Sequence, residues 1–178
     1  MPTPPTGPDH TDSTQPQDNS TQAPTPRERA LAALESSEID FTITEHGPVN
    51  SLEEAAQVRG VTPRDIVKSL VVRVSEGRYI FVLVAGNRQV SWAKVRKVLG
   101  VSRLHMPDAQ EAFDVTGYVR GTITPFGTLT PLEVIVDEPI MGRRVSIGAG
   151  AHGVAATVDA DDLIRVLGAT VADVGEER

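Results

Sequence analysis

One lysine stands inside an apolar run that is otherwise typical of a buried β-strand. Lys68 lies within residues 66–72, IVKSLVV, and the two-residue period of a strand places it on the same face as Leu70 and Val72. Lysine is almost never buried without a partner. Lys68 is therefore either a functional cation in a cleft, able to bind a phosphate or orient a substrate carbonyl or amine, or an edge-strand residue whose stem covers apolar surface.

Residues 121–127, GTITPFG, predict a loop that could approach a ligand closely. Glycine stands at both ends, where it removes the steric barrier of a side chain, and Pro125 holds the turn. Amides that point inward from such a loop could bind an oxyanion or an adenosine end. The alternative is an ordinary connection between two strands.

Residues 148–153, GAGAHG, have the G-x-G-x-x-G spacing of dinucleotide-binding loops, but the context excludes that function. The fingerprint needs a helix directly after the glycines, whereas residues 154–158, VAATV, predict a strand. We expect a glycine-rich hairpin that lines a pocket. His152 lies in this hairpin and is the one histidine that we single out as a candidate substrate contact, although a loop histidine without a role is the simpler explanation.

Composition removes several kinds of chemistry. The 178 residues contain no cysteine, which excludes disulfides, thiolate nucleophiles and cysteine-ligated metal sites. The four histidines show no metal-ligand spacing, and no G-x-S-x-G motif marks a serine hydrolase. We therefore expect neither a metal nor a cofactor.

Charge is distributed unevenly along the chain. The net charge is −7, yet residues 59–103 contain ten Lys or Arg against the two acids Asp65 and Glu76. This stretch carries a charge of about +8, which could attract phosphates or could be a solvated surface. The asymmetry permits a nucleic acid partner without requiring one.

The chain divides into a tail and one domain. Residues 1–26 are rich in Pro, Thr, Gln and Ser with few apolar residues, so we predict a disordered tail followed by a single domain over residues 27–178. The sequence lacks a signal peptide and any apolar run long enough to span a membrane, and we expect a cytoplasmic protein without membrane contact.

Periodicity and capping signals predict an α+β fold with helices flanking a mixed, mostly antiparallel, barrel-like sheet. Predicted helices cover 27–36, 52–59, 92–99, 108–113 and 160–167, and predicted strands cover 39–43, 66–74, 79–85, 132–136, 144–147 and 154–158.

Three ordered motifs resemble the YbaK family, the free-standing relatives of the editing domain inserted in bacterial prolyl-tRNA synthetase. They are residues 67–71 (VKSLV), 84–89 (VAGNRQ) and 117–127 (GYVRGTITPFG), and residues 145–150 with 161–163 are similar to the closing segment of the family. The similarity extends over residues 39–174. It implies hydrolysis of mischarged aminoacyl-tRNA, in most members tRNA for proline, and a mixed α/β fold around a barrel-like sheet.

The resemblance also assigns candidate site residues. Lys68 matches the essential lysine of the family, residues 121–125 match its substrate loop, and residues 148–150 match the backbone that borders the aminoacyl pocket. The predicted substrate-binding residues are Asn87, Gly121, Thr122, Ile123, Thr124, Pro125, Gly148, Ala149, Gly150 and His152. Many relatives have glycine in place of Thr122 and serine in place of Thr124, which puts the identity of the amino acid in doubt.

The expected function is therefore a trans-editing deacylase that acts on the acylated 3′ end of tRNA, with prolyl-tRNA synthetase as a possible partner. A catalytically silent module that binds tRNA or a synthetase is the first alternative. A small-molecule hydrolase or nucleotide-binding domain with the same fold is the second.

Overall fold

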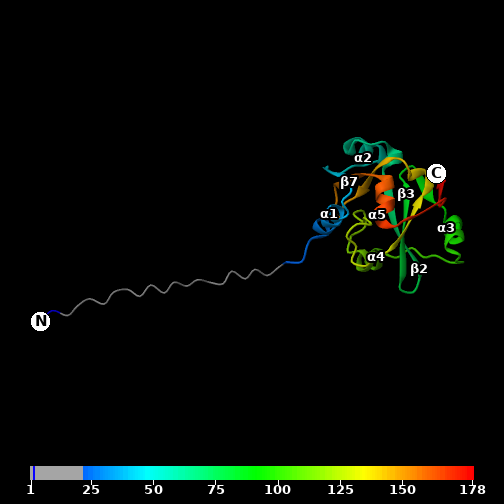
Figure 1. Cartoon of the computed structure of the whole chain (residues 1–178), viewed down its shortest axis with the longest axis horizontal. Helices are drawn as coiled ribbons and strands as arrows, with labels where there is room; N and C mark the ends of the chain where they lie inside the picture. The colour runs from blue at the N-terminus through cyan, green and yellow to red at the C-terminus, as the bar shows by residue number, and fades with distance from the viewer. Residues whose placement is uncertain (1, 3–21) are drawn as a thin grey trace.

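The computed structural model describes residue 2 and residues 22–178, and the predicted tail lies mostly outside these residues. Within them the helices are α1 (Pro26–Ser36), α2 (Leu52–Arg59), α3 (Trp92–Leu99), α4 (Ala109–Thr116) and α5 (Ala160–Leu167). The strands are β1 (Phe41–Glu45), β2 (Val67–Ser75), β3 (Arg78–Ala85), β4 (Arg88–Val90), β5 (Glu133–Asp137), β6 (Arg144–Gly148), β7 (Val154–Asp159), β8 (Thr170–Ala172) and β9 (Gly175–Glu177). Two single turns of 3-10 helix, η1 (Pro63–Asp65) and η2 (Glu138–Ile140), complete the fold (Figure 1).

Capping residues set the helix ends as their types predict. Ser51 caps α2 by accepting a hydrogen bond from the Glu54 amide at 3.0 Å, and Gly60 ends the helix in the left-handed conformation. Asp108 caps α4 in the same way, accepting a bond from the Glu111 amide at 2.8 Å. These caps fix where α2 begins and ends and where α4 begins. The end of α2 and the beginning of α4 both border the candidate site.

The strands form three sheets. Their orders are β1-β7-β6, β2-β3-β5-β8 and β4-β9. The β3–β5 and β5–β8 pairs are parallel and the other pairs are antiparallel. The predicted α+β class with a mixed, mostly antiparallel arrangement is thus confirmed. No pairing between β1 and β8 closes the sheets into a barrel in the part of the chain that the structure describes.

The two larger sheets meet edge to edge at one point. An isolated parallel bridge joins Ile66, just before β2, to Ser146 in β6. At the far end of β2, Arg73 forms a second isolated bridge with His105. Between these two bridges no described strand pairs with the outer edge of β2, and this open stretch contains Lys68.

The core lies on both faces of β3. Phe81, Leu83 and Ala85 pack in a cluster with residues of β6, β7 and α5, whereas Ile80, Val82 and Val84 pack in a second cluster toward α3. A strand buried on both faces needs a continuous apolar sequence, which β3 has. Because β3 is rigidly held, it fixes its neighbour β2 and the residues along the open edge.

Three short strands were not predicted. β4, β8 and β9 each have three residues and no clear alternation of apolar and polar side chains. β9 pairs with β4 at the C-terminal end of the chain, and this pair lies next to Lys68, as described below. No helix among the described residues is long and apolar enough to cross a membrane.

Candidate active site

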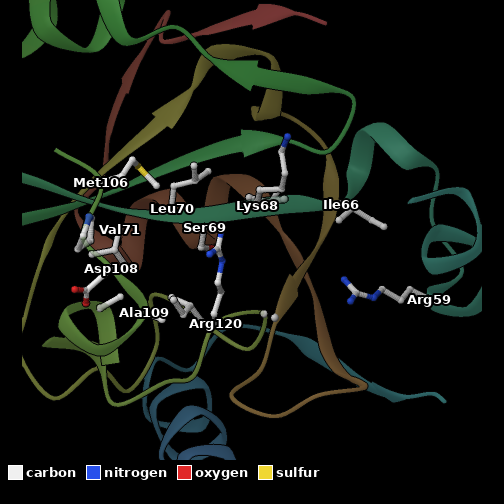
Figure 2. A pocket seen from close by; sticks show the side chains of 16 residues that line it. Arg59, Ile66, Lys68, Ser69, Leu70, Val71, Met106, Asp108, Ala109 and Arg120 are labelled. Carbon is white, nitrogen blue, oxygen red and sulfur yellow. The ribbon is translucent and has the colours of Figure 1, made fainter. Parts of the chain in front are cut away.

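A cavity of about 570 Å³ lies along the open edge of β2 (Figure 2). Its size is in the range of small-molecule sites in proteins. The lining residues come from α2, β2 and the residue before it, the segment that leads into α4, α4 itself, the loop at 120–123 and the end of β6. They are Arg59, Ile66, Val67, Lys68, Ser69, Leu70, Val71, Met106, Pro107, Asp108, Ala109, Ala112, Arg120, Gly121, Ile123 and Gly148.

The two strand edges present backbone groups to this cavity. Arg73 exchanges both backbone hydrogen bonds with His105 on the outer edge of β2, at 2.9 and 3.0 Å. Because backbone groups alternate between the two edges of a strand, Ser69 and Val71 also direct their N–H and C=O groups outward. Directly after β6 the Ala149 amide donates to Val154 in β7, so the Gly148 amide faces the opposite side, toward β2.

Lys68 stands where its ammonium is held by a backbone carbonyl. The residue is half-buried, and its Nζ donates to the main-chain oxygen of Arg88 at 2.5 Å. Burial lowers the pKa of Lys68, and repulsion from Arg178 lowers it further. No carboxylate pairs with this ammonium among the described residues. An ammonium has three donors, so two remain for a ligand.

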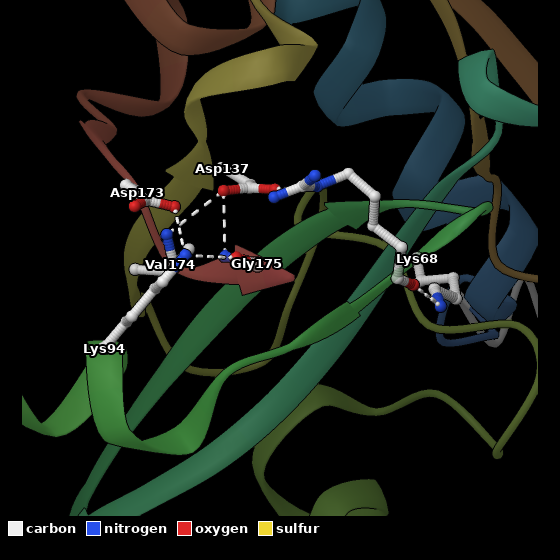
Figure 3. Close-up of polar contacts among 7 residues, drawn as sticks. Lys68, Lys94, Asp137, Asp173, Val174 and Gly175 are labelled. Atoms are coloured by element: carbon white, nitrogen blue, oxygen red, sulfur yellow. Dashed lines mark hydrogen bonds and ion pairs between the residues drawn. The ribbon is translucent and has the colours of Figure 1, made fainter. Parts of the chain in front are cut away.

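The Arg88 carbonyl is itself positioned by a buried carboxylate (Figure 3). Asp137 is fully buried and accepts hydrogen bonds from Arg88 Nε at 3.0 Å and from the amides of Val174 and Gly175 at 3.1 and 2.9 Å. These bonds join β4 to the C-terminal segment. Asp137 therefore determines, through Arg88, where the partner of Lys68 lies.

Two arginines add positive charge to the cavity. Arg59, at the end of α2, is half-buried and contacts His46 Nε2 at 3.3 Å and Ser146 Oγ at 3.5 Å. Burial lowers its pKa. Arg120 is exposed and forms no ion pair with any described residue. In Figure 2 Arg120 extends toward Ser69, whose buried hydroxyl has no hydrogen-bond partner among the described residues.

The two glycine-containing bends lie against each other. The Gly150 amide donates to the Thr122 carbonyl at 3.1 Å. A Cβ atom on Gly148 would lie 3.0 Å from the Ile123 carbonyl oxygen, so glycine permits this close approach. A Cβ on Gly121 would lie 3.4 Å from the His152 ring. The bends thus form one wall, of which Gly121, Ile123 and Gly148 line the cavity.

The other predicted residues of the bends lie behind this wall. Thr122, Thr124, Pro125, Ala149 and Gly150 are buried and do not line the cavity. The amides of Thr122, Ala149 and Gly150 already donate within the fold. The amides of Gly121 and Ile123, by contrast, have no backbone acceptor among the described residues, and that of Gly148 points toward β2.

Two predicted residues lie elsewhere on the surface. Asn87 is exposed in the turn between β3 and β4, outside the cavity lining. His152 is exposed beside Gly121 and also does not line the cavity. Each lies beside a residue that contributes to the site. Asn87 precedes Arg88, whose carbonyl binds Lys68, and His152 lies beside Gly121, which lines the cavity.

Sequence reasoning did not identify several cavity residues. Arg59, Asp108 and Arg120 carry charge into the site, and Ser69 carries an unpaired hydroxyl. For Arg120 a signal was available, because it directly precedes the candidate loop. The excess of positive charge in residues 59–103 was a weaker indication of a phosphate-binding site, because four of its basic residues form ion pairs with acids outside this stretch. These pairs are Arg73–Glu111, Arg78–Glu133, Arg88–Asp137 and Lys94–Asp173.

The fold is that of an editing domain. The chain belongs to the aminoacyl-tRNA editing domain family, whose profile matches residues 46–166. It is 24% identical to the prolyl-tRNA editing protein ProX of Acetoanaerobium sticklandii, over 79% of this chain and 90% of that protein. A solved structure of a candidate trans-editing enzyme for prolyl-tRNA synthetase superposes with a TM-score of 0.77, at 28% identity over 87% of this chain and 99% of the other.

Similarity also extends to synthetases that carry such a domain. The proline–tRNA ligase of Bacillus licheniformis is 30% identical over 108 residues, which are 60% of this chain. The match spans 18% of the ligase, so this chain resembles one domain of that protein. The resemblance to the free-standing editing proteins, by contrast, extends over nearly their whole length.

Proposed function

We propose that this chain hydrolyses the ester bond of mischarged aminoacyl-tRNA as a free-standing editing enzyme. The observation that carries the proposal is that Lys68 and both glycine-containing bends line one cavity. Membership of the editing-domain family supports it, as does similarity to a prolyl-tRNA editing protein along nearly its full length. The substrate we favour is tRNA for proline that carries a small wrong amino acid.

The cations are suited to hold the nucleotide end of the substrate. Arg59, Lys68 and Arg120 all line the cavity, and none forms an ion pair with a described carboxylate. Guanidinium and ammonium groups bind phosphate oxygens strongly when no carboxylate competes. We assign to Lys68 the terminal phosphate or the carbonyl end of the acylated adenosine.

Hydrolysis of an aminoacyl ester needs little beyond positioning and charge stabilisation. Water adds to the ester carbonyl carbon, the bond from that carbon to the ribose oxygen breaks, and the proton that water loses passes to the ribose oxygen. The products are the free amino acid and the uncharged tRNA end. The 2′-hydroxyl of the tRNA or a group of the amino acid relays the proton, so no protein nucleophile is required.

The oxyanion of the tetrahedral intermediate would be stabilised by backbone amides. The Gly148 amide faces the cavity by strand alternation, and the amides of Gly121 and Ile123 have no backbone partner among the described residues. Donors fixed by the fold stabilise developing charge without reorganisation. The unpaired hydroxyl of Ser69 is a further donor to the same group.

A screen of mischarged tRNAs tests the proposal. Wild-type protein is incubated with tRNA(Pro) carrying alanine, cysteine, serine or threonine, and release of the free amino acid is followed with Lys68→Ala as the blank. We expect rapid release for at least one substrate and a loss of at least ~10² with Lys68→Ala. Saturable binding without release would instead identify a silent binding module. Turnover that does not weaken as salt increases would favour a small-molecule hydrolase.

The partners follow from the same proposal. We place the enzyme in the cytoplasm, where charged tRNA is used. A prolyl-tRNA synthetase could supply recognition of the tRNA body, because the cavity accommodates only the acylated end. Addition of the synthetase to the screen tests this, since a required partner would restore activity on substrates that the chain alone does not hydrolyse.

A further inference from the structure

The charges that line the cavity are separated in space. In Figure 2 Arg59 and Asp108 lie at opposite sides of the cavity, with Arg120 between them. Asp108 is the one carboxylate among the described residues that line it, against three cations. The cavity thus has a cationic end beside α2 and an end with a single carboxylate beside α4.

Asp108 has binding capacity that its structural role does not use. One carboxylate oxygen accepts the Glu111 amide at 2.8 Å and caps α4. The other oxygen forms no hydrogen bond or ion pair with any described residue. Arg120 lines the same cavity but is not within ion-pair distance of Asp108. A carboxylate accepts several hydrogen bonds, so capping leaves Asp108 free to bind a cation.

The walls around Asp108 are apolar and partly made of small side chains. Leu70 and Val71 contribute from β2, and Met106, Ala109 and Ala112 contribute from the other side. Such a lining suits a small aliphatic side chain and offers it no charged partner. Asp108 is the one negatively charged residue of the lining with which a cation bound here could form an ion pair.

An aminoacyl ester carries the group that matches this end of the cavity. Its α-ammonium lies on the carbon next to the reacting carbonyl, and its phosphate lies on the far side of the ribose. Binding the phosphate at Arg59 and Lys68 directs the amino acid toward Asp108. We propose that Asp108 binds the α-ammonium group of the aminoacyl ester and so selects substrates with a free amine.

This inference rests on the proposed function and makes it more specific. Every aminoacyl-tRNA carries the free amine, whereas peptidyl-tRNA and N-formylated tRNA do not. An acceptor for the ammonium would restrict hydrolysis to esters that have not been acylated at nitrogen. The ammonium bound at Asp108 remains protonated, which leaves the 2′-hydroxyl or a side-chain group of the amino acid to orient the attacking water.

The test uses Asp108→Asn, because asparagine caps a helix as well as aspartate does and removes only the charge. The substrate is the mischarged tRNA that the wild type hydrolyses fastest, and its N-acetylated form is the comparison. We expect wild type to prefer the free amine, and Asp108→Asn to lose about tenfold to a hundredfold on that substrate. The rate on the acetylated substrate should not change.

Asp159→Asn is the matched control. Asp159 caps α5 by accepting the amides of Asp161 and Asp162, and it does not line the cavity. Equal losses on both substrates with Asp108→Asn would overturn the inference, as would a wild type that hydrolyses both equally well. A wild type that hydrolyses no aminoacyl ester would overturn the proposed function itself, so the two failures are distinguishable.

Discussion

The ammonium of Lys68 donates a hydrogen bond to the main-chain carbonyl of Arg88 at 2.5 Å. The two residues are 20 positions apart and lie on different strands, and the bond joins the open edge of β2 to the β4–β9 pair. The candidate catalytic cation is therefore placed by the backbone of a short strand. That strand in turn is held by the buried carboxylate of Asp137 (Figure 3).

Removal of Asp137 should destabilise the fold and displace Lys68. Asp137→Ala leaves the Arg88 guanidinium and two backbone amides without their buried acceptor. We expect the free energy of unfolding to fall by about 3–5 kcal/mol, and deacylation by the protein that remains folded to decrease. Urea denaturation and initial rates measure the two effects.

Asp173→Ala is the matched control for this change. Asp173 pairs with Lys94 at 2.9 Å on the surface, and both side chains are well exposed. Exposed pairs contribute at most about 1 kcal/mol, so stability and rate should change little. If Asp137→Ala were as mild as Asp173→Ala, the account of how Lys68 is positioned would be wrong.

Gly148→Ala should impair the site more than the fold. The added methyl group would lie 3.0 Å from the Ile123 carbonyl oxygen and 3.6 Å from that of Thr122, so the loop must move away. Because small misplacements in a site reduce rates strongly, we expect a loss of kcat/KM of about tenfold. Gly47→Ala is the control, since an added Cβ there meets no atom within 4 Å. Equal kinetics for both variants would remove the loop from the site.

The pH dependence of kcat/KM should reveal the environment of Lys68. Burial and the charge of Arg178 lower the pKa of Lys68, so its ammonium is lost at a lower pH than that of an exposed lysine. Activity that needs the charged form should decline as pH rises through this lowered pKa. Arg178→Ala removes the repulsion and should move the decline to higher pH.

Initial rates corrected for spontaneous ester hydrolysis measure this decline. Arg178→Lys keeps the positive charge and should leave the profile in place. A profile that shifts with Arg178→Lys as much as with Arg178→Ala would show that the effect is not electrostatic.

The sequence predicted the elements whose signals are local. Strand β3 is a continuous apolar run, and α2 is enclosed by Ser51 and Gly60, so its bounds could be predicted from capping alone. β4 and β9 could not be predicted, because a run of three residues with at most one apolar side chain becomes a strand only when a distant segment pairs with it. The Lys68–Arg88 contact depends on the pairing of β4 with β9, so it could not be predicted from the sequence either.

The site residues that could be predicted are those that lie within a recognisable sequence motif. Lys68, Gly121 and Gly148 stand in patterns that suggested a role, and the structure brings them to one cavity. Arg59 and Asp108 have ordinary positions at a helix end and a helix cap. Their presence in the cavity follows from how α2 and α4 pack beside β2, which a sequence pattern does not encode.

The most direct test of the central claim is single-turnover deacylation of a mischarged tRNA by wild type and by Lys68→Ala. Single turnover isolates the chemical step from product release. The account predicts a rate at least ~10² lower for Lys68→Ala, with an unfolding transition close to that of wild type because the side chain is only half-buried. A folded Lys68→Ala protein that deacylates at the wild-type rate would contradict it.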